Sequence, residues 1–219
     1  MQNNRIDIII KQIKTSGRVI DVGSDHAQLA IRLLKKHQAT HVYNVEVHKE
    51  PYQTTVRNLQ SHGLLAQTTN ILGDGLQTHK IDKPIKYCVI AGMGTKNIIN
   101  ILTRANQQIK IQEFILVPNN NAGDLRDFLM QNDYKFKFEQ IIEERGYYYA
   151  LMVVSKTKGL TIHNKFDSYY GPYNLKHPSK TFQQMHQQRK QHILKNALHT
   201  HNKHIQAELN LLEENKIWK

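Results

Sequence analysis

The sequence predicts an α/β protein with a mostly parallel sheet and a helical C-terminal part. Three observations favour this fold class. The β-branched run Arg18-Val-Ile-Asp-Val22 is followed by Gly23 and then by a helix pattern with Leu33 and Leu34 on one face. Further strand-like runs alternate with helix patterns along the chain. The last two runs are joined only by Glu144-Arg-Gly146, which is too short for a helical crossover and therefore requires an antiparallel hairpin.

The elements follow from hydrophobic spacing and from the positions of glycine and proline. The first helix places four isoleucines on one stripe, and Gly17 marks its end. We expect this helix to pack on the sheet or to cover the cofactor edge. Later helices are expected at 25–37, from Pro51 to just before Gly63, after residue 94, and around Leu125 to Leu129. The expected ranges are 4–16 for the first helix and 18–22, 41–46, 69–72, 86–90, 114–117, 134–143 and 147–155 for the strands.

Beyond Ser155 the alternation stops, and we place a domain boundary there. Residues 156–178 are expected to be loop-like, because they contain Gly171, Pro172 and Pro178. Two helical segments follow at about 179–199 and 201–216. Because only a thin apolar seam is available, we expect them to form an antiparallel hairpin of coiled-coil type. The sequence thus predicts a Rossmann-like domain over 1–155 and a linker with a helical domain over 156–219.

Charge is distributed unevenly along the 219 residues. The net charge is +12, and residues 155–219 hold 11 Lys and Arg against 4 Asp and Glu. This density of positive charge favours a polyanion partner, and no long apolar run or signal peptide is visible. We therefore expect a cytoplasmic protein that meets RNA through its C-terminal domain, with Arg5 of the first helix as a further contact. The expected phosphate contacts are Arg5, Lys180, Arg189, Lys190, Lys195 and Lys203.

Cysteine and histidine give no sign of a metal or disulfide. The single cysteine, Cys88, lies in the apolar run Tyr87-Cys-Val-Ile90, so an intrachain disulfide is excluded and a buried thiol is expected. The 13 histidines are scattered without zinc-ligand spacing. We therefore expect no metal, and we favour a monomer.

The turn at Gly23 is the predicted cofactor site. A dinucleotide site continues with two more glycines beneath the pyrophosphate, whereas Asp25 and Ala27 follow here. Carboxylates repel phosphate, but Asp21 and Asp25 suit a ligand with positive groups, such as the sulfonium and ammonium of S-adenosylmethionine.

Two more acids follow the next strands. Glu46 is placed to accept hydrogen bonds from ribose hydroxyls, and Asp74 could accept from an adenine amino group. The glycine-rich run after the fourth strand lies at the same edge of the sheet. The full expected cofactor set is Asp21, Gly23, Ser24, Asp25, His26, Glu46, Val47, Asp74, Gly75, Ala91, Gly92 and Met93.

Several motifs together resemble the bacterial TrmK family. They are Asp21-Val-Gly-Ser-Asp-His-Ala27, Gly73-Asp-Gly75, Ile90-Ala-Gly-Met-Gly94, Pro118-Asn-Asn120 ahead of Leu125-Arg126, and Gly171-Pro-Tyr173 before the helical tail. The resemblance implies a class I S-adenosylmethionine-dependent methyltransferase fold and a tRNA (adenine-N1)-methyltransferase that acts on adenosine 22. Family members often carry an aromatic residue after the Asp-His-Ala run, where this chain has Gln28.

For that reaction the protein has to position the adenine and does not have to activate it. Neutral N1 of adenine is already nucleophilic, so the site must hold it near the methyl group and orient the ring through an acceptor for the exocyclic amine. Asn119, Asp25 and His26 are the candidates for this catalytic role. Because N1 lies on the Watson–Crick edge, the base must leave its stack, and Tyr147, Tyr148 and Tyr149 are possible stacking partners.

Other functions remain open at this point. A class I methyltransferase could act on another nucleic acid or on a small molecule, although Val117-Pro-Asn-Asn120 differs from the Asp/Asn-Pro-Pro-aromatic motif of exocyclic-amine enzymes. A basic RNA-binding protein with a vestigial cofactor fold is a second alternative. A nicotinamide oxidoreductase is disfavoured by the missing glycines and by the final hairpin.

Overall fold

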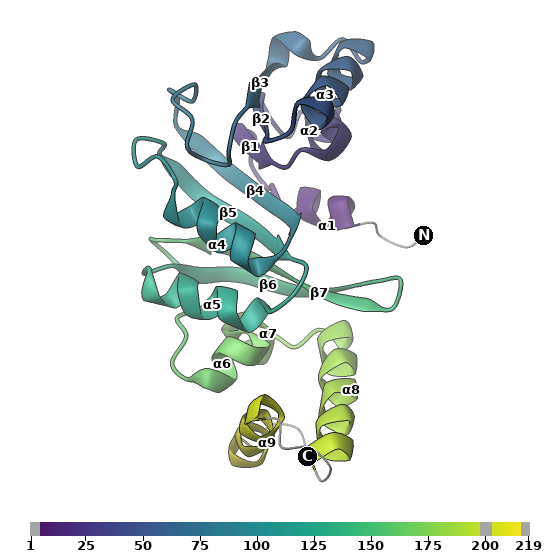
Figure 1. The fold of residues 1–219 in the computed structure, drawn as a ribbon, viewed down its shortest axis with the longest axis vertical. Coiled ribbons are helices and arrows are strands. Elements are labelled where there is room, and N and C mark those ends of the chain that lie inside the picture. The colour runs from purple at the N-terminus through teal and green to yellow at the C-terminus, as the bar shows by residue number, and fades with distance from the viewer. Residues whose placement is uncertain (1–4, 198–202, 216–219) are drawn as a thin grey trace.

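A computed structural model describes residues 5–197 and 203–215. Within these residues one seven-stranded sheet has the order β3-β2-β1-β4-β5-β7-β6 (Figure 1). Strands β1 to β5 pair in parallel, and β7 is antiparallel to both β5 and β6, which confirms the predicted fold class. The strands are β1 (Arg18–Val22), β2 (His41–Glu46), β3 (Thr68–Leu72), β4 (Ile85–Met93), β5 (Ile111–Pro118), β6 (Lys135–Glu144) and β7 (Tyr147–Ser155).

Helices cover both faces of the sheet. Alternate strand residues point to opposite faces, so Val19 and Val89 share a hydrophobic cluster with one group of helices, whereas Ile20 and Cys88 share a cluster with the other. Cys88 is fully buried as predicted, and burial raises the pKa of its thiol. The first group is α1 (Arg5–Gln12), α2 (Gln28–Lys35) and α3 (Lys49–Ser61), and the second is α4 (Thr95–Thr103) and α5 (Ala122–Gln131). Two short 3-10 helices, η1 (Asp25–Ala27) and η2 (Leu65–Gln67), lie in the connections.

The segment after Ser155 differs from the expected loop. It contains α6 (Lys165–Tyr170) and α7 (Pro172–Lys176), so the prediction of a loop-like linker is wrong over these residues. The Asn164 side chain accepts a hydrogen bond from the backbone N–H of Asp167 and caps α6. Gly171 separates the two helices at φ 90°, and Pro172 opens the second.

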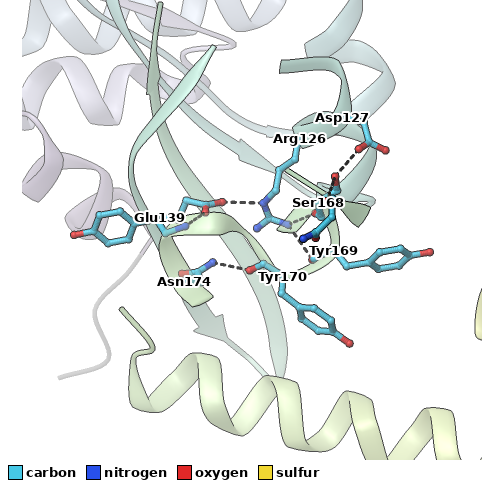
Figure 2. A network of polar contacts seen from close by, with 9 residues as sticks. Arg126, Asp127, Glu139, Ser168, Tyr169, Tyr170 and Asn174 are labelled. Carbon is cyan, nitrogen blue, oxygen red and sulfur yellow. Dashed lines mark hydrogen bonds and ion pairs between the residues drawn. The ribbon is translucent and has the colours of Figure 1, made fainter. Parts of the chain in front are cut away.

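A buried polar network fixes these short helices on the sheet (Figure 2). Arg126 of α5 and Glu139 of β6 are almost fully buried, and Arg126 Nε donates to Glu139 Oε1 over 2.8 Å. Arg126 Nη1 also donates to the carbonyl oxygens of Ser168 and Tyr169, each at 3.0 Å. The second oxygen of Glu139 accepts from the backbone N–H of Tyr173. The network therefore satisfies backbone groups of both α6 and α7.

The last helices are α8 (Lys180–Ala197) and α9 (Lys203–Asn215). Phe182 of α8 and Tyr170 of α6 belong to the same hydrophobic cluster as β5 and β7. The predicted boundary at Ser155 therefore marks a change in sequence pattern rather than a gap in packing. Buried Glu208 of α9 accepts from the Tyr170 hydroxyl and pairs with Arg189 of α8. A polar cluster thus joins these helices, and the coiled-coil interpretation stays a prediction.

Candidate functional site

The carboxyl ends of β1, β2 and β4 form the edge where the sequence predicted a cofactor site. The turn after β1 is closed by a 2.9 Å hydrogen bond from the Gly23 N–H to the Val45 carbonyl. Asp21 and Glu46 are 6% and 7% exposed. The Ser24 hydroxyl donates to Glu46 Oε1 over 3.2 Å, which fixes one oxygen of that carboxylate. Two carboxylates on adjacent strand ends are thus held almost completely out of water.

The next residues adopt an unusual backbone conformation. His26 and Ala27 both have φ 59°, the left-handed region that non-glycine residues rarely occupy. The bend is held by a 2.7 Å bond from the Ala27 N–H to the Ser24 carbonyl and by Asn58 of α3, which donates to the His26 carbonyl. The His26 side chain is exposed at this bend. The Asp25 side chain, predicted to be both catalytic and cofactor-binding, lies outside what the structure describes.

Strand β4 ends in a bulge that brings Asn119 to the same edge. The pairing of β4 with β5 shifts between Ala91 and Met93, and Gly92 has φ +75°. The Asn119 N–H donates to the Met93 carbonyl over 2.8 Å, and the Asn119 side-chain Nδ2 donates to the Gly92 carbonyl over 2.7 Å. The predicted catalytic Asn119 and the predicted cofactor residues Gly92 and Met93 are therefore joined directly.

Arg5 also lies at this edge of the sheet. Its Nη1 donates to Asn119 Oδ1 over 3.2 Å, and its Nε and Nη2 contact Glu144 Oε2 at 2.9 and 2.8 Å. Its guanidinium carbon stands 4.1 Å from the centroid of the Tyr149 ring. The Arg5 side chain is therefore held by three residues of the protein and is only 25% exposed, and its contact with RNA phosphate stays a prediction.

A cavity of about 210 Å3 opens between these residues. Arg5 and Glu144 stand at its wall together with Asp21, and apolar side chains of α1 and α2 complete it. The lining residues are Arg5, Ile6, Ile9, Asp21, Gly23, Ser24, Gln28, Leu29, Val89, Ala91, Gly92 and Glu144. Two carboxylates and one guanidinium give the cavity a net negative wall, which suits a cationic ligand.

The remaining predicted cofactor residues follow β2 and β3 along the same edge. Val47, directly after Glu46, is 54% exposed, and beside the predicted residues Leu72 at the end of β3 is 48% exposed. Asp74 is exposed, and its Oδ2 accepts from Arg104, the residue directly after α4, over 2.9 Å and from Gln77 over 3.1 Å. Exposed apolar side chains flanked by carboxylates match a purine ring with ribose hydroxyls and an amino group.

The glycines test whether S-adenosylmethionine fits this edge. A Cβ on Gly92 would meet no atom within 4 Å, so it would stand in the open space that Gly92 lines. A Cβ on Gly23 would lie 2.4 Å from Met93 Cε. Glycine at both positions leaves a concave backbone surface beside Asp21, and the residues present therefore fit a ligand with a sulfonium and an ammonium.

Replacing Gly23 with alanine should weaken cofactor binding. The variant forces a side chain into a left-handed position, φ +75°, and against Met93. We expect the affinity for S-adenosylmethionine, measured by calorimetry, to fall about tenfold, which corresponds to about 1.4 kcal/mol. Gly63→Ala is the matched control, because Gly63 has φ +68° with no neighbour within 4 Å. Equal affinities in both variants would remove Gly23 from the cofactor site.

Glu144 lines the cavity but was not among the predicted site residues. Glu144 ends β6, and β6 runs in the same direction as β5 because both are antiparallel to β7. Its carboxyl end therefore meets the same edge as the predicted acids. An acid at a strand end before a short turn was the signal that could have indicated it.

The predicted RNA contacts on α8 do not form one stripe. Lys180 and Lys195 are exposed, and because they are fifteen residues apart they lie about 60° from one another around the helix axis. Lys190 is half-buried, and Arg189 is paired with Glu208 over 2.7 Å. The side chain of Lys203 lies outside what the structure describes. Lys180 and Lys195 are thus the best-placed pair for a phosphate backbone.

Residues 5–197 and 203–215 contain no group of three or more His, Cys, Asp or Glu side chains that lie close enough together to hold a metal ion. No helix in these ranges is long and apolar enough to span a bilayer.

The sheet order and the final antiparallel strand define the class I S-adenosylmethionine-dependent methyltransferase fold. The family model described as tRNA (adenine(22)-N(1))-methyltransferase, TrmK, matches residues 19–217, and the chain belongs to this family.

Curated relatives agree with this assignment. The Bacillus subtilis tRNA (adenine(22)-N(1))-methyltransferase is 30% identical over 152 residues, which cover 69% of this chain and 63% of the relative. A candidate tRNA methyltransferase of Mycoplasma pneumoniae is 31% identical over 141 residues, 64% of either chain. The matched region spans a little under two thirds of the length of these curated relatives.

Solved structures resemble the whole chain. A candidate tRNA (m1A22) methyltransferase of Streptococcus pneumoniae, in complex with S-adenosyl-L-methionine, superposes with a TM-score of 0.85 at 28% identity and covers 98% of this chain and 99% of that one. The TrmK of M. capricolum in complex with S-adenosyl-homocysteine has a TM-score of 0.86 at 24% identity, with 98% of both chains covered. The second likeness shows the fold alone.

Proposed function

We propose that this protein transfers a methyl group from S-adenosylmethionine to N1 of adenosine 22 in tRNA. The observation that carries the proposal is the arrangement of Asn119 beside a cavity walled by Asp21 and Glu144, in a chain of the TrmK family. The carboxylates favour a cationic cofactor, and the Asn119 amide supplies a hydrogen-bond acceptor for an adenine amine. We further propose that the protein acts as a cytoplasmic monomer.

The residues of the sheet edge are proposed to hold the cofactor along its length. Asp21 and the turn at Gly23 would face the methionine part, and Glu46 would accept from the ribose hydroxyls while Ser24 holds its other oxygen. Val47 and Asp74 would contact the adenine ring and its amino group. When bound, the cofactor supplies an electrophilic methyl group on a sulfonium. His26 and Asp25, at the strained turn, are proposed to close the site next to the methyl acceptor.

The chain's own part in the reaction is to position and to exclude water. Asn119 Oδ1 would accept from the exocyclic amine of the target adenine and place N1 in line with the methyl group. As the N1 lone pair bonds to the methyl carbon, the carbon–sulfur bond breaks, its electron pair stays on sulfur, and the positive charge moves to the adenine ring, where the amide oxygen would stabilise it. No base is needed before the attack, because neutral N1 carries no proton. Ile6 and Ile9, which line the cavity, keep water from that region.

The β6–β7 hairpin is proposed to meet the RNA. It projects beyond the sheet on the side where α1 lies (Figure 1). Tyr149 is covered by Arg5, and Tyr148 packs against the core on the opposite strand face. Tyr147 at the tip is 69% exposed. Of the three tyrosines, Tyr147 is therefore the proposed stacking partner for a base that has left its helix.

Charge reversal on α8 tests the proposed phosphate contacts. A deletion of the C-terminal helices is a poor test, because it would remove buried Phe182 from the core. The double variant Lys180→Glu with Lys195→Glu changes only exposed positions. We expect tRNA affinity to fall and the slope of its logarithm against log salt to decrease by about 2, about 1 for each lost phosphate contact. Lys158→Glu with Lys176→Glu is a control of equal charge on exposed positions elsewhere. An equal loss in the control would show that only net charge matters.

The activity itself is tested with unmodified tRNA transcripts and tritiated S-adenosylmethionine. We expect incorporation of one methyl group per tRNA, recovered as N1-methyladenosine on nucleoside analysis. A transcript with guanosine at position 22 serves as the matched substrate and should accept none. Methylation of both transcripts, or of neither while the cofactor binds, would refute the proposed reaction.

A further inference from the structure

The Asn119 amide has one defined orientation. The Gly92 carbonyl can only accept a hydrogen bond, so the group at 2.7 Å from it must be the amide nitrogen. The Arg5 guanidinium can only donate, so the group at 3.2 Å from it must be the amide oxygen. A flipped amide would set donor against donor and acceptor against acceptor. The two neighbours together therefore determine which end of the amide faces each of them.

We propose that Arg5 is a positioning residue for methyl transfer, which fixes the acceptor end of the Asn119 amide. The inference rests on the proposed function and goes beyond it, because it places the first helix in the reaction. Asn119 is exposed, and without Arg5 the Gly92 carbonyl alone would orient its amide, while the amide oxygen would lose the donor that holds it. An amide oxygen has two acceptor sites, so Arg5 occupies one and leaves the other for the adenine amine.

Arg5 is itself held in place from two sides. A single oxygen, Glu144 Oε2, accepts from both Nε and Nη2, and these two contacts fix the plane of the guanidinium. The Tyr149 ring lies 4.1 Å below the guanidinium carbon. Both partners come from the β6–β7 hairpin, so the hairpin orients Arg5 and Arg5 orients Asn119.

The ion pair also removes an electrostatic conflict. A free cation beside the methyl acceptor would oppose the positive charge that develops on adenine. The Glu144 carboxylate balances the Arg5 charge within hydrogen-bond distance, so the guanidinium can donate to Asn119 without adding net charge. Lysine could not hold Glu144 through two nitrogens and reach Asn119 at the same time.

The test separates positioning from simple anchoring of α1. Arg5→Met is compared with Arg32→Met, because Arg32 of α2 pairs with Asp7 of α1 over 2.8 Å and also ties α1 to the domain. We expect Arg5→Met to lower kcat about 10- to 100-fold, with the Kd for S-adenosylmethionine changed less than about threefold. We expect Arg32→Met to keep the wild-type kcat. Equal losses in both variants would show that Arg5 only anchors the helix and would overturn the proposal.

A double-mutant cycle provides the second measurement. If Arg5 acts through the amide, adding Arg5→Met to Asn119→Ala should change kcat by less than about twofold. If the double variant is folded and its loss of kcat equals the product of the two single losses, Arg5 and Asn119 act independently and the proposal is overturned. Both outcomes presuppose that the wild-type protein methylates tRNA, so a wild type without activity refutes the proposed function and is distinguishable from either result.

Discussion

Replacement of Arg126 by methionine is expected to destabilise the protein by about 3–5 kcal/mol. The substitution leaves the Glu139 carboxylate, which is 0% exposed, without its cation. It also leaves the carbonyl oxygens of Ser168 and Tyr169 without their donor (Figure 2). Equilibrium unfolding in urea measures the loss. A loss under about 1 kcal/mol would contradict this account of the network.

The surface pair next to this network is the control. Lys165 forms an ion pair with Asp127, yet its side chain is 65% exposed. We expect Lys165→Met to cost less than about 1 kcal/mol, because water screens an exposed pair. Arg126→Met combined with Glu139→Met should cost less than the sum of the single changes, since no buried charge remains. It should still be destabilising, because the Tyr173 N–H loses its acceptor.

The pH dependence of Arg126→Met follows from the same geometry. Burial raises the pKa of the Glu139 carboxyl above its ordinary 4.5, and Arg126 opposes that rise. Without Arg126 the folded pKa rises further, while the unfolded pKa does not change. Between the two values the folded state holds a proton that the unfolded state releases, so stability decreases as pH rises through this window. The loss should therefore be larger at pH 8 than at pH 5.

The sheet could be predicted because its strands carry their own signal. Runs such as Val42-Tyr-Asn-Val45 and Tyr87-Cys-Val-Ile90 are buried on both faces, and therefore read as apolar and β-branched. Helices α6 and α7 carry no such signal. They are six and five residues long, too short for helical periodicity. Their carbonyl and N–H groups are satisfied by Arg126 and Glu139, and this contact is invisible before the chain is folded.

Part of the candidate site could likewise be predicted from the sequence, and part could not. The placement of Asp21, Glu46 and Asp74 along one edge of the sheet could be predicted, because consecutive parallel strands end at one edge. The carboxylates that pair with the arginines could not be predicted. Arg5 meets Glu144 across 139 residues of sequence, and Arg189 meets Glu208 only because α9 packs beside α8. The sequence shows that a residue is positively charged. It does not show whether a carboxylate of the same protein pairs with that charge in the folded state.

Asn119→Ala is expected to lower kcat for tRNA methylation about 10²- to 10³-fold, with the Kd for S-adenosylmethionine changed less than about threefold. The amide oxygen is the proposed acceptor for the adenine amine, and its interaction strengthens as charge develops on the ring. Its loss therefore acts on the transition state more than on ground-state binding. The measurement is steady-state methyl transfer at saturating tRNA and S-adenosylmethionine, with single-turnover kinetics to isolate the chemical step.

Asn120→Ala is the matched control in the same loop. The Asn120 side chain accepts a 3.1 Å hydrogen bond from the Thr95 N–H at the start of α4, so it has a structural partner away from the cavity. We expect this variant to lose about 1 kcal/mol of stability and to retain the wild-type kcat. If the two variants lose activity equally, the loop as a whole and not the Asn119 amide sustains the reaction. If Asn119→Ala keeps the wild-type kcat, another group orients the adenine. The proposed role of Arg5 in positioning the Asn119 amide is then also refuted.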